Sequence, residues 1–299
     1  MEAGFLPELI TIYGNTSQSA RIAEIALFIN QLRKAGIPLE IWSEFAGYLQ
    51  ERNVNVEGIR RVEEPSENSG MVLTLGGDGT LLHAAAWCGT RRLPLLGINT
   101  GHLGFLTAYT LSETHLLIPD LRGGKLVTER RTLLQLSLAE QEKASLPADL
   151  WPCALNEVAI LKADSSSMIS VSVTAHGSFL TDYRADGLIV STPTGSTGYS
   201  LSAGGPVMEP QIDCLVLTPI APHTLSIRPI VVGADTLIEL RTNSRDGSYR
   251  VALDGRSFTM PADTVLRLRS AEKPLLLMRR RDVDFATTLR TKLHWGHPE

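Results

Sequence analysis

The chain has 299 residues, of which 43% are hydrophobic, and a formal net charge of −4 at pH 7; this is enough to bury the cores of two ordinary domains. Its basic residues are dispersed except for the triplet Arg279, Arg280 and Arg281. The long basic stripe of a nucleic-acid-binding protein is therefore excluded, we expect no nucleic-acid partner, and we predict that the triplet is a solvated strand end.

The first part of the chain predicts alternating strands and helices. Short apolar runs predict strands at residues 9–13, 37–42, 71–75 and 93–98. Residues 17–35 place apolar side chains at helical spacing before Gly36. These side chains are Ile22, Ile25, Ala26, Ile29 and Leu32. Strands that alternate with helices indicate a parallel sheet. Residues 43–70 are polar and poorly patterned, and the sequence does not assign them a role.

A glycine-rich turn follows the strand at 71–75. It consists of Gly76, Gly77, Asp78, Gly79 and Thr80 and opens into a helix that is expected to reach about Cys88. Glycines let the backbone approach an anion, and a helix N-terminus supplies unpaired N–H groups. The turn therefore predicts a phosphate-binding site. It lacks the lysine of a P-loop and the spacing of a dinucleotide-binding fingerprint.

Asp78 requires an explanation of its own because a phosphate repels a carboxylate. Asp78 would be tolerated if it held a metal ion or took a proton from an attacking hydroxyl, and both roles belong to phosphoryl transfer. The alternative is that Asp78 only caps the helix that begins near Thr80. In open parallel sheets, ligands bind beyond the carboxyl ends of the strands, where residues 76–80 and 99–105 would both lie.

From about Lys125 the pattern changes to short alternating segments, which predict strands. These segments are residues 133–138, 157–161, 169–175, 188–191, 215–219 and 236–241. Turn signals such as Asp246-Gly247 and Asp254-Gly255 separate several such runs and indicate an antiparallel sandwich.

The predicted fold has two domains. Residues 1–124 form an α/β domain with a parallel, Rossmann-like sheet, which carries the glycine-rich turn. Residues 125–275 form an all-β, sandwich-like domain. Residues 276–299 are expected to pack back on the first domain through a C-terminal helix at about 284–295.

A second cluster of glycines and hydroxyls lies at residues 192–206, directly after the strand at 188–191. Hydroxyls on a tightly turned backbone hydrogen-bond ribose hydroxyls and base edges without adding charge. Tyr199 adds a flat apolar face with a polar tip. The alternative is a structural turn that is rich in serine and threonine.

The two clusters together resemble the NAD kinase family, which phosphorylates the adenosine 2′-hydroxyl of NAD to give NADP. The resemblance rests on residues 76–80 and 192–202 with Asn156-Glu157 between them, and residues 99–106 and 221–229 support it. It covers nearly the whole chain. The turn at 76–80 also occurs in related lipid kinases, whereas the run at 192–202 resembles NAD kinases specifically.

The resemblance implies a role for each matching residue. Asp78 matches the general base that acts on the 2′-hydroxyl, and Gly76, Gly77, Gly79 and Thr80 surround the phosphates. The positions implied to bind NAD are Phe105, Asn156, Glu157, Arg184, Asp186, Thr194, Ser196, Thr197, Tyr199, Ser202, Ala221 and His223. On chemistry alone, Asn156-Glu157 could be ordinary surface, Phe105 core, and His223 a structural loop residue.

The resemblance further implies the substrates and partners. The donor is ATP or polyphosphate, the cofactor is Mg²⁺ or another divalent metal with unassigned ligands, and NAD binds between the two domains. The family forms homodimers and homotetramers. Two alternatives remain open at this stage: a lipid kinase of the diacylglycerol type from the same superfamily, and an NAD-binding sensor that has lost catalysis.

Cysteine usage and hydropathy favour a cytoplasmic enzyme. Cys88, Cys153 and Cys214 form no C-x-x-C pair, which argues against a disulfide framework or a zinc knuckle. No apolar stretch reaches the roughly 18 residues of a membrane span, and the N-terminus lacks the layout of a signal peptide. We therefore expect reduced cysteines and no membrane partner.

Overall fold

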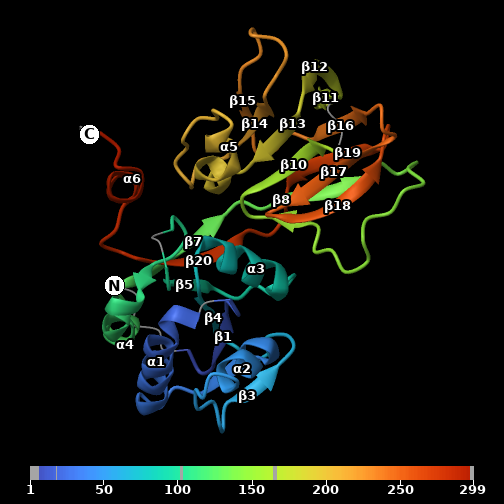
Figure 1. Ribbon diagram of the computed structural model, residues 1–299. Helices are drawn as coiled ribbons and strands as arrows, with labels where there is room; N and C mark the ends of the chain where they lie inside the picture. The colour runs from blue at the N-terminus through green and yellow to red at the C-terminus, as the bar shows by residue number, and fades with distance from the viewer. Residues whose placement is uncertain (1–6, 18, 102–103, 164–166, 297–299) are drawn as a thin grey trace. The chain divides into compact units, whose positions relative to one another are not determined.

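The computed structural model describes residues 7–17, 19–101, 104–163 and 167–296 (Figure 1). The chain separates into two compact units, residues 1–130 with 275–299 and residues 131–274. Among the helices in the described part of the chain, none combines the length and the apolarity that a membrane crossing needs.

The first unit is built on a mixed, mainly parallel sheet, as predicted. Its strands follow the order β3-β2-β1-β4-β5-β20-β7, with β6 paired to β5. They are β1 (Ile10–Gly14), β2 (Leu39–Trp42), β3 (Arg60–Val62), β4 (Met71–Leu75), β5 (Leu95–Asn99), β6 (Tyr109–Thr110), β7 (Leu126–Arg131) and β20 (Leu275–Arg280). The neighbours from β3 to β20 pair in parallel. Along the chain, β2 and β3 are added to one side of β1, and β4 is then added to its other side. The direction of strand order therefore reverses at a switch point between β1 and β4.

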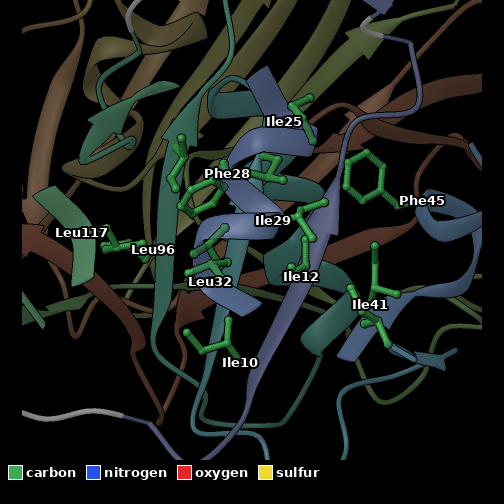
Figure 2. Close-up of a cluster of buried hydrophobic side chains, with 14 of the residues drawn as sticks. Ile10, Ile12, Ile25, Phe28, Ile29, Leu32, Ile41, Phe45, Leu96 and Leu117 are labelled. Carbon is green, nitrogen blue, oxygen red and sulfur yellow. The ribbon is translucent and has the colours of Figure 1, made fainter. Parts of the chain in front are cut away.

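Helices cover both faces of this sheet. They are α1 (Ile22–Lys34), α2 (Ser43–Gln50), α3 (Asp78–Cys88), α4 (Thr114–Arg122) and α6 (Phe285–Leu293), with short 3₁₀ turns at Ser19–Arg21 and Leu111–Glu113. Figure 2 shows the apolar stripe of α1, including Phe28 and Leu32, against Ile10 and Ile12 of β1. Because side chains alternate along a strand, Gly97 lies on the opposite face, where it meets Leu81 of α3.

The segment 43–70, to which the sequence pattern assigned no role, contains α2 and β3. Phe45, Ala46 and Leu49 of α2 are fully buried, although polar residues surround them in the sequence. The predicted helix at 17–35 is also shorter, because its first turn is a 3₁₀ turn and α1 begins at Ile22.

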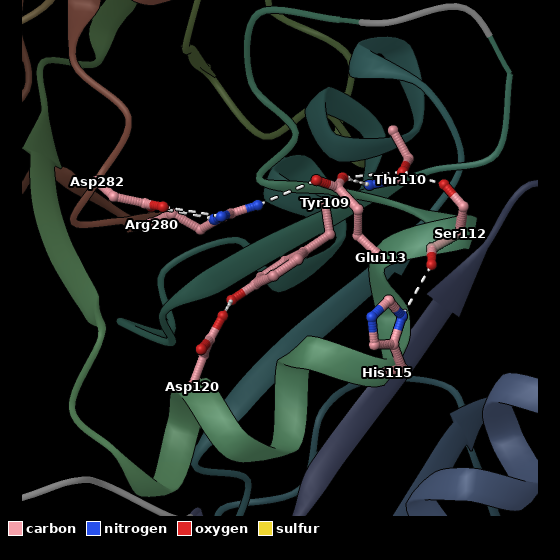
Figure 3. A network of polar contacts seen from close by, with 8 residues as sticks. All are labelled: Tyr109, Thr110, Ser112, Glu113, His115, Asp120, Arg280 and Asp282. Atoms are coloured by element: carbon pink, nitrogen blue, oxygen red, sulfur yellow. Dashed lines mark hydrogen bonds and ion pairs between the residues drawn. The ribbon is translucent and has the colours of Figure 1, made fainter.

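The C-terminal segment contributes both β20 and α6 to the first unit. Arg280 of β20 bonds to Glu113 at 3.0 Å and to Asp282 at 2.8 Å, and its guanidinium lies 5.5 Å from the ring centroid of Tyr109 (Figure 3). The Tyr109 hydroxyl donates to Asp120, and burial raises the pKa of Tyr109. β20 is therefore tied to the chain segment that follows β5.

The basic triplet at the end of β20 is not the solvated strand end that the sequence predicted. Arg279 is only 8% exposed and donates to the hydroxyl of Thr288 in α6 at 3.0 Å. Arg280 is engaged by two carboxylates, and only Arg281 is exposed. A guanidinium next to the end of a strand can bind a helix of its own unit as readily as solvent.

The second unit is the predicted antiparallel β-sandwich. One six-stranded sheet has the order β15-β14-β13-β10-β17-β18, and the other has the order β12-β11-β16-β19-β8-β9. The first comprises β10 (Glu157–Lys162), β13 (Gly187–Ser191), β14 (Cys214–Ile220), β15 (Ile230–Gly233), β17 (Ser248–Leu253) and β18 (Arg256–Pro261). The second comprises β8 (Leu134–Leu138), β9 (Cys153–Ala154), β11 (Ile169–Ala175), β12 (Ser178–Ala185), β16 (Ile238–Asn243) and β19 (Val265–Ser270).

Both sheets of the second unit contribute to a single apolar core. Val158 and Val190 come from the first sheet, and Val171 and Leu240 come from the second. All four are fully buried, as expected when the inner faces of two sheets interdigitate. The rest of this unit contains only short helical turns, Thr194–Thr197 and α5 (Tyr199–Ser202), in its described residues.

Candidate active site

The glycine turn lies where the parallel sheet is expected to bind a ligand. Gly76 and Gly77 connect the end of β4 to α3, whose first residue is Asp78. Thr80 is buried in the first turn of α3, and its N–H donates to the carbonyl of Gly77 at 3.0 Å. The turn therefore stands at the carboxyl end of β4, beside the switch point, with the N-terminus of α3 directed at it.

Asp78 does not cap its own helix. The N-cap position is Gly77, and the Asp78 carboxylate accepts hydrogen bonds from the loop after β5 instead. The N–H of Phe105 donates to Oδ2 at 2.6 Å, and the N–H of Leu106 donates to Oδ1 at 3.0 Å. A side chain on Gly104 would overlap the carboxylate, so only glycine permits this approach. The capping alternative is wrong, and two amides fix the direction of the carboxylate.

Phe105 and Lys292 complete the surroundings of Asp78 within the first unit. The ring of Phe105 is half-buried, and its centroid lies 5.8 Å from the ammonium nitrogen of Lys292 in α6. Burial lowers the pKa of Lys292 to about 8, with Arg279 acting in the same direction and the charge of Asp78 opposing it. Lys292 is thus a cation close to a turn that carries no lysine of its own.

A cavity of ≈ 460 Å³ opens beside the glycine turn. Its walls are Tyr13, Gly14, Asn15, Thr16, Trp42, Gly77, Gly79, Thr80 and His83. These residues come from the carboxyl ends of β1 and β2, from the turn, and from α3. The cavity therefore lies at the switch point between β1 and β4.

In the second unit, the pair Asn156-Glu157 is held by a hairpin turn. Asp254 sits between β17 and β18 with a φ of 46°, and it is 5% exposed. Its carboxylate accepts the backbone N–H groups of Leu155, Asn156 and Glu157 at 2.7, 2.9 and 3.1 Å. The sequence predicted this Asp-Gly pair as a turn, but its role in orienting the start of β10 depends on tertiary structure.

Two acceptor atoms of this pair lack partners among the described residues. They are Oδ1 of Asn156 and Oε2 of Glu157, and both are buried. Burial and the neighbouring Asp254 raise the pKa of Glu157 to about 7, although the N–H of Tyr199 opposes this shift. Because buried acceptors are costly when unpaired, this arrangement favours a ligand that brings hydrogen-bond donors.

The hydroxyl-rich loop at 192–202 is hydrogen-bonded to the backbone of Asn156 in the same pair and of Leu155, the residue before it. Thr192 donates its N–H to the carbonyl of Asn156 at 2.9 Å and its hydroxyl to the carbonyl of Leu155 at 2.5 Å. A side chain at Gly195 would overlap the backbone of Asn156, so glycine is required for this approach. The loop and Asn156-Glu157 therefore form one structural group.

The predicted residues within this loop differ in exposure. Ser196 is fully buried, and its hydroxyl accepts the N–H of Met208 at 3.0 Å. Thr194 is also buried and accepts a bond from Arg131 at 3.3 Å. Thr197 is half-buried, Ser202 is exposed, and Tyr199 is 41% exposed. The buried hydroxyls of this loop bond within the protein, whereas the side chain of Tyr199 is exposed to solvent.

Four predicted residues lie at the other end of β13. Asp186 pairs with Lys162 at 2.8 Å, and its N–H donates to the carbonyl of Ile220. The N–H of His223 donates to the carbonyl of Arg184 at 2.9 Å, and Ala221 has a φ of 45°. Arg184, Ala221 and His223 are exposed. Since the loop at 192–202 follows the opposite end of β13, the structure places the predicted dinucleotide residues in two groups.

Comparison with known proteins decides between the alternatives that the sequence left open. The chain is 41% identical over 286 residues to the NAD kinase of Bacteroides fragilis, which covers 95% of this chain and 97% of the relative. It is 42% identical to the NAD kinase of Porphyromonas gingivalis over 96% of the chain and 98% of the relative. The chain belongs to the NAD kinase family. The lipid kinase and the sensor are not favoured.

Family models and solved structures agree with this assignment. Residues 51–125 match the ATP-NAD kinase N-terminal domain, and residues 155–279 match the ATP-NAD kinase C-terminal domain. Yeast NADH kinase, solved with NADH, has the same fold with a TM-score of 0.85 at 22% identity, over 98% of this chain and 89% of that one. An NAD kinase from Archaeoglobus fulgidus, solved with ATP, has a TM-score of 0.70 at 26% identity, over 95% and 99% of the two chains.

The described residues of this NAD kinase family member form no preformed cage for the predicted divalent metal. Within the described ranges, no group of three or more His, Cys, Asp or Glu side chains could hold an ion. Asp78 belongs to the glycine turn, and each of its oxygens accepts one amide hydrogen. Among the described residues, Asp78 is therefore not part of a preformed metal cage.

Proposed function

We propose that the chain transfers the terminal phosphoryl group of ATP, or of polyphosphate, to the adenosine 2′-hydroxyl of NAD to give NADP. The observation that carries this proposal is the Asp78 carboxylate. It stands at the start of α3 beside the glycine turn, and two backbone amides hold it in one direction. A carboxylate fixed in this way suits proton removal from a hydroxyl that attacks a phosphoryl group.

The donor phosphates are proposed to bind at Gly76, Gly77, Gly79 and Thr80. The turn supplies a backbone that a phosphate can approach, and α3 supplies its N-terminal N–H groups and partial positive charge. The Archaeoglobus relative was solved with ATP, which supports a nucleotide donor. Mg²⁺ commonly binds through substrate phosphates, so in our proposal it arrives with the donor.

The adenosine half of NAD is proposed to bind at Asn156-Glu157 and the loop at 192–202. The unpartnered acceptors of Asn156 and Glu157 require donors, and adenosine has an exocyclic amine and ribose hydroxyls that donate. Thr194, Ser196, Thr197, Tyr199 and Ser202 are the proposed loop residues, with Phe105 toward the nicotinamide end. The yeast relative solved with NADH supports a dinucleotide ligand.

The proposed reaction is a direct transfer. The 2′-oxygen of NAD forms a bond to the terminal phosphorus as the bond from that phosphorus to the bridging oxygen of the donor breaks. Asp78 accepts the proton of the 2′-hydroxyl, and ADP leaves with the bonding electron pair. Each oxygen of Asp78 has a lone pair left beyond its amide bond, so it can accept this proton without releasing the loop.

We also propose that the enzyme is a homodimer or homotetramer. Arg184, Asp186, Ala221 and His223 lie one length of β13 away from the loop at 192–202, roughly 15 Å at 3.3 Å per residue. This separation supports a role for them in the NAD site of a neighbouring subunit. If so, an inactive Glu157→Ala variant mixed with an inactive Asp186→Ala variant should regain NADP formation. A monomeric mass by light scattering at full activity would contradict the proposal.

We place the protein in the cytoplasm. Cys88, Cys153 and Cys214 are all free thiols, and all three are buried. Burial raises the pKa of Cys88 to about 12 and that of Cys153 to about 11. Unpaired thiols of this kind suit a reducing compartment.

The experiment that tests the function is an assay of NADP formation. Purified protein is incubated with NAD, Mg²⁺ and either ATP or polyphosphate, and NADP is detected with an NADP-specific dehydrogenase. We expect NADP with at least one donor. NAD binding without NADP formation under every donor would favour the sensor instead, and phosphorylation of a lipid headgroup would favour the lipid kinase.

A further inference from the structure

The cavity beside the glycine turn has two chemically different sides. One side is formed by Gly77, Gly79 and Thr80, where the backbone and the N-terminus of α3 suit phosphate. The other side is formed by Tyr13 at the end of β1 and Trp42 at the end of β2. An inorganic polyphosphate chain would use only the first side, whereas a nucleotide has groups for both.

The aromatic side is held rigidly. The rings of Tyr13 and Trp42 stack with centroids 4.4 Å apart and an angle of 13° between their planes. Trp87 of α3 packs against Tyr13 with a centroid distance of 5.2 Å. Tyr13 is 8% exposed, and burial raises its pKa to about 12, so it remains a neutral phenol. One face of Trp42 is thus covered by Tyr13, while the half-buried indole still lines the cavity.

The described residues that line the cavity carry almost no charge. They include neither a lysine, an arginine, an aspartate nor a glutamate, and His83 is their one titratable side chain apart from Tyr13. Among these described lining residues, a polyanion that extended along the walls would meet neither a lysine nor an arginine to balance its charge. A purine and its ribose are neutral, and their flat face and hydroxyls match an aromatic wall with nearby Asn15 and Thr16.

We propose that this cavity binds the base of a nucleoside triphosphate against Trp42, and that it makes ATP, rather than inorganic polyphosphate, the preferred phosphoryl donor. The assignment rests on the proposed function, because it takes the glycine turn as the site of the donor phosphates. Stacking of a base on an aromatic side chain is worth about 5- to 150-fold in affinity. Trp42 therefore selects the donor, while Asp78 acts on the acceptor.

The test compares ATP with tripolyphosphate, which has the phosphates of ATP but no base or ribose. Wild type, Trp42→Leu and Trp42→Phe are assayed for the KM of ATP and for inhibition by tripolyphosphate against ATP. We expect Trp42→Leu to raise the KM of ATP about tenfold, and Trp42→Phe, which keeps a ring, to raise it less than threefold. The inhibition constant of tripolyphosphate should stay within twofold in both variants.

Trp87→Phe is the matched control. Trp87 belongs to the same aromatic cluster, and its indole N–H donates to the carbonyl of Glu63 at 2.6 Å, but it does not line the cavity. This variant should leave the KM of ATP within twofold. An equal loss for ATP and tripolyphosphate in Trp42→Leu, or an unchanged KM of ATP, would overturn the inference. Thermal unfolding midpoints identify a variant that has merely lost stability. If Trp42→Leu is unstable, the KM of ATP and the inhibition by tripolyphosphate are compared between wild type and Trp42→Phe.

A binding measurement separates this inference from the proposed function. ATP is titrated into protein without NAD, and the quenching of tryptophan fluorescence is recorded for wild type and Trp42→Phe. Quenching that Trp42→Phe removes supports the base site even if no NADP forms in any assay. NADP formation together with quenching that Trp42→Phe leaves unchanged would retain the kinase and reject the base site.

Discussion

Asp78 in the first unit and Glu157 in the second are the two carboxylates that we propose to act in the reaction, and each has different surroundings within its own unit. Asp78 has an amide N–H on each oxygen and Lys292 nearby, so its negative charge is well balanced. Glu157 has an oxygen without a partner, lies beside the acidic Asp254, and has a pKa raised to about 7. The first environment suits a group that reacts as an anion, and the second suits a group that binds a neutral ligand by hydrogen bonding.

The largest expected effect is the loss of turnover when Asp78 is replaced. Asp78→Asn should lower kcat by about 10²–10⁴, because the side chain can no longer take the proton of the 2′-hydroxyl. The KM for NAD should stay within about twofold. The matched control is Asp284→Asn, which also removes a carboxylate that accepts a backbone N–H in the first unit, at the N-terminus of α6. A kcat near that of wild type in Asp78→Asn would reject Asp78 as the base.

The raised pKa of Glu157 predicts that the stability of the protein depends on pH. Because the pKa of Glu157 in the folded state, about 7, exceeds its ordinary value of 4.5, the folded state binds more protons between these values. The contribution of Glu157 is therefore fully present below about pH 4.5 and is lost as pH rises through 7. The expected loss in the free energy of unfolding is about 1–3 kcal/mol, because a tenfold change in proton affinity corresponds to roughly 1.4 kcal/mol.

Urea unfolding at several pH values measures this effect. Glu157→Gln should flatten the dependence of the unfolding free energy on pH between 4.5 and 7. Glu209→Gln is the control, because Glu209 is an exposed glutamate of the same unit. A pH dependence that survives in Glu157→Gln would show that Glu157 titrates normally.

Lys292 places a positive charge near Asp78, whereas the neighbouring charge that acts on Glu157 is the acidic Asp254. The charged groups that act on it are Asp78 of α3 and Arg279 of β20. Lys292→Met should lower kcat/KM for ATP about tenfold at pH 7. In wild type, kcat/KM for ATP should fall as pH rises through about 8, where the ammonium loses its proton.

Arginine provides the conservative replacement for Lys292. It stays charged throughout this pH range, so Lys292→Arg should keep activity and lose the fall above pH 8. Arg290→Gln, an exposed cation of the same helix, should leave both quantities unchanged. If Lys292→Met and Arg290→Gln behaved alike, Lys292 would have no specific role at the turn.

The smallest effect is expected at Tyr199. This side chain is 41% exposed at the start of α5, so Tyr199→Ala should raise the KM for NAD about fivefold and leave kcat nearly unchanged. Phe179 of β12, an aromatic that is 67% exposed, is the control, and Phe179→Ala should have no effect. An unchanged KM for NAD in Tyr199→Ala would remove Tyr199 from the site.

The sequence predicted the parts of the molecule that depend on local pattern. β4, the glycine turn and α3 could be identified because an apolar run, three glycines and a helix start follow one another. β11 was predicted with its observed ends, since its side chains alternate cleanly between the core and the surface. The helix α2 was missed because it spans only Ser43–Gln50. α4 was missed as well, and it contains Pro119.

Asp254 in the second unit and Lys292 in the first depend on contacts between distant segments of their own units. Asp254 was predicted as part of a turn, but its carboxylate orients Asn156, which lies 98 residues earlier in the chain. Lys292 reaches the surroundings of Asp78 only because β20 joins the first sheet and α6 follows it. No local pattern around either residue indicates its partner, so the folded structure was needed to find them.

The most direct test of the division between the two carboxylates is calorimetric titration of NAD into wild type, Asp78→Asn and Glu157→Gln. We predict that Asp78→Asn binds NAD with a Kd within about twofold of wild type, although it forms almost no NADP. We predict that Glu157→Gln binds NAD at least about fivefold more weakly. Equal weakening in both variants, or normal NAD binding by Glu157→Gln, would contradict the account.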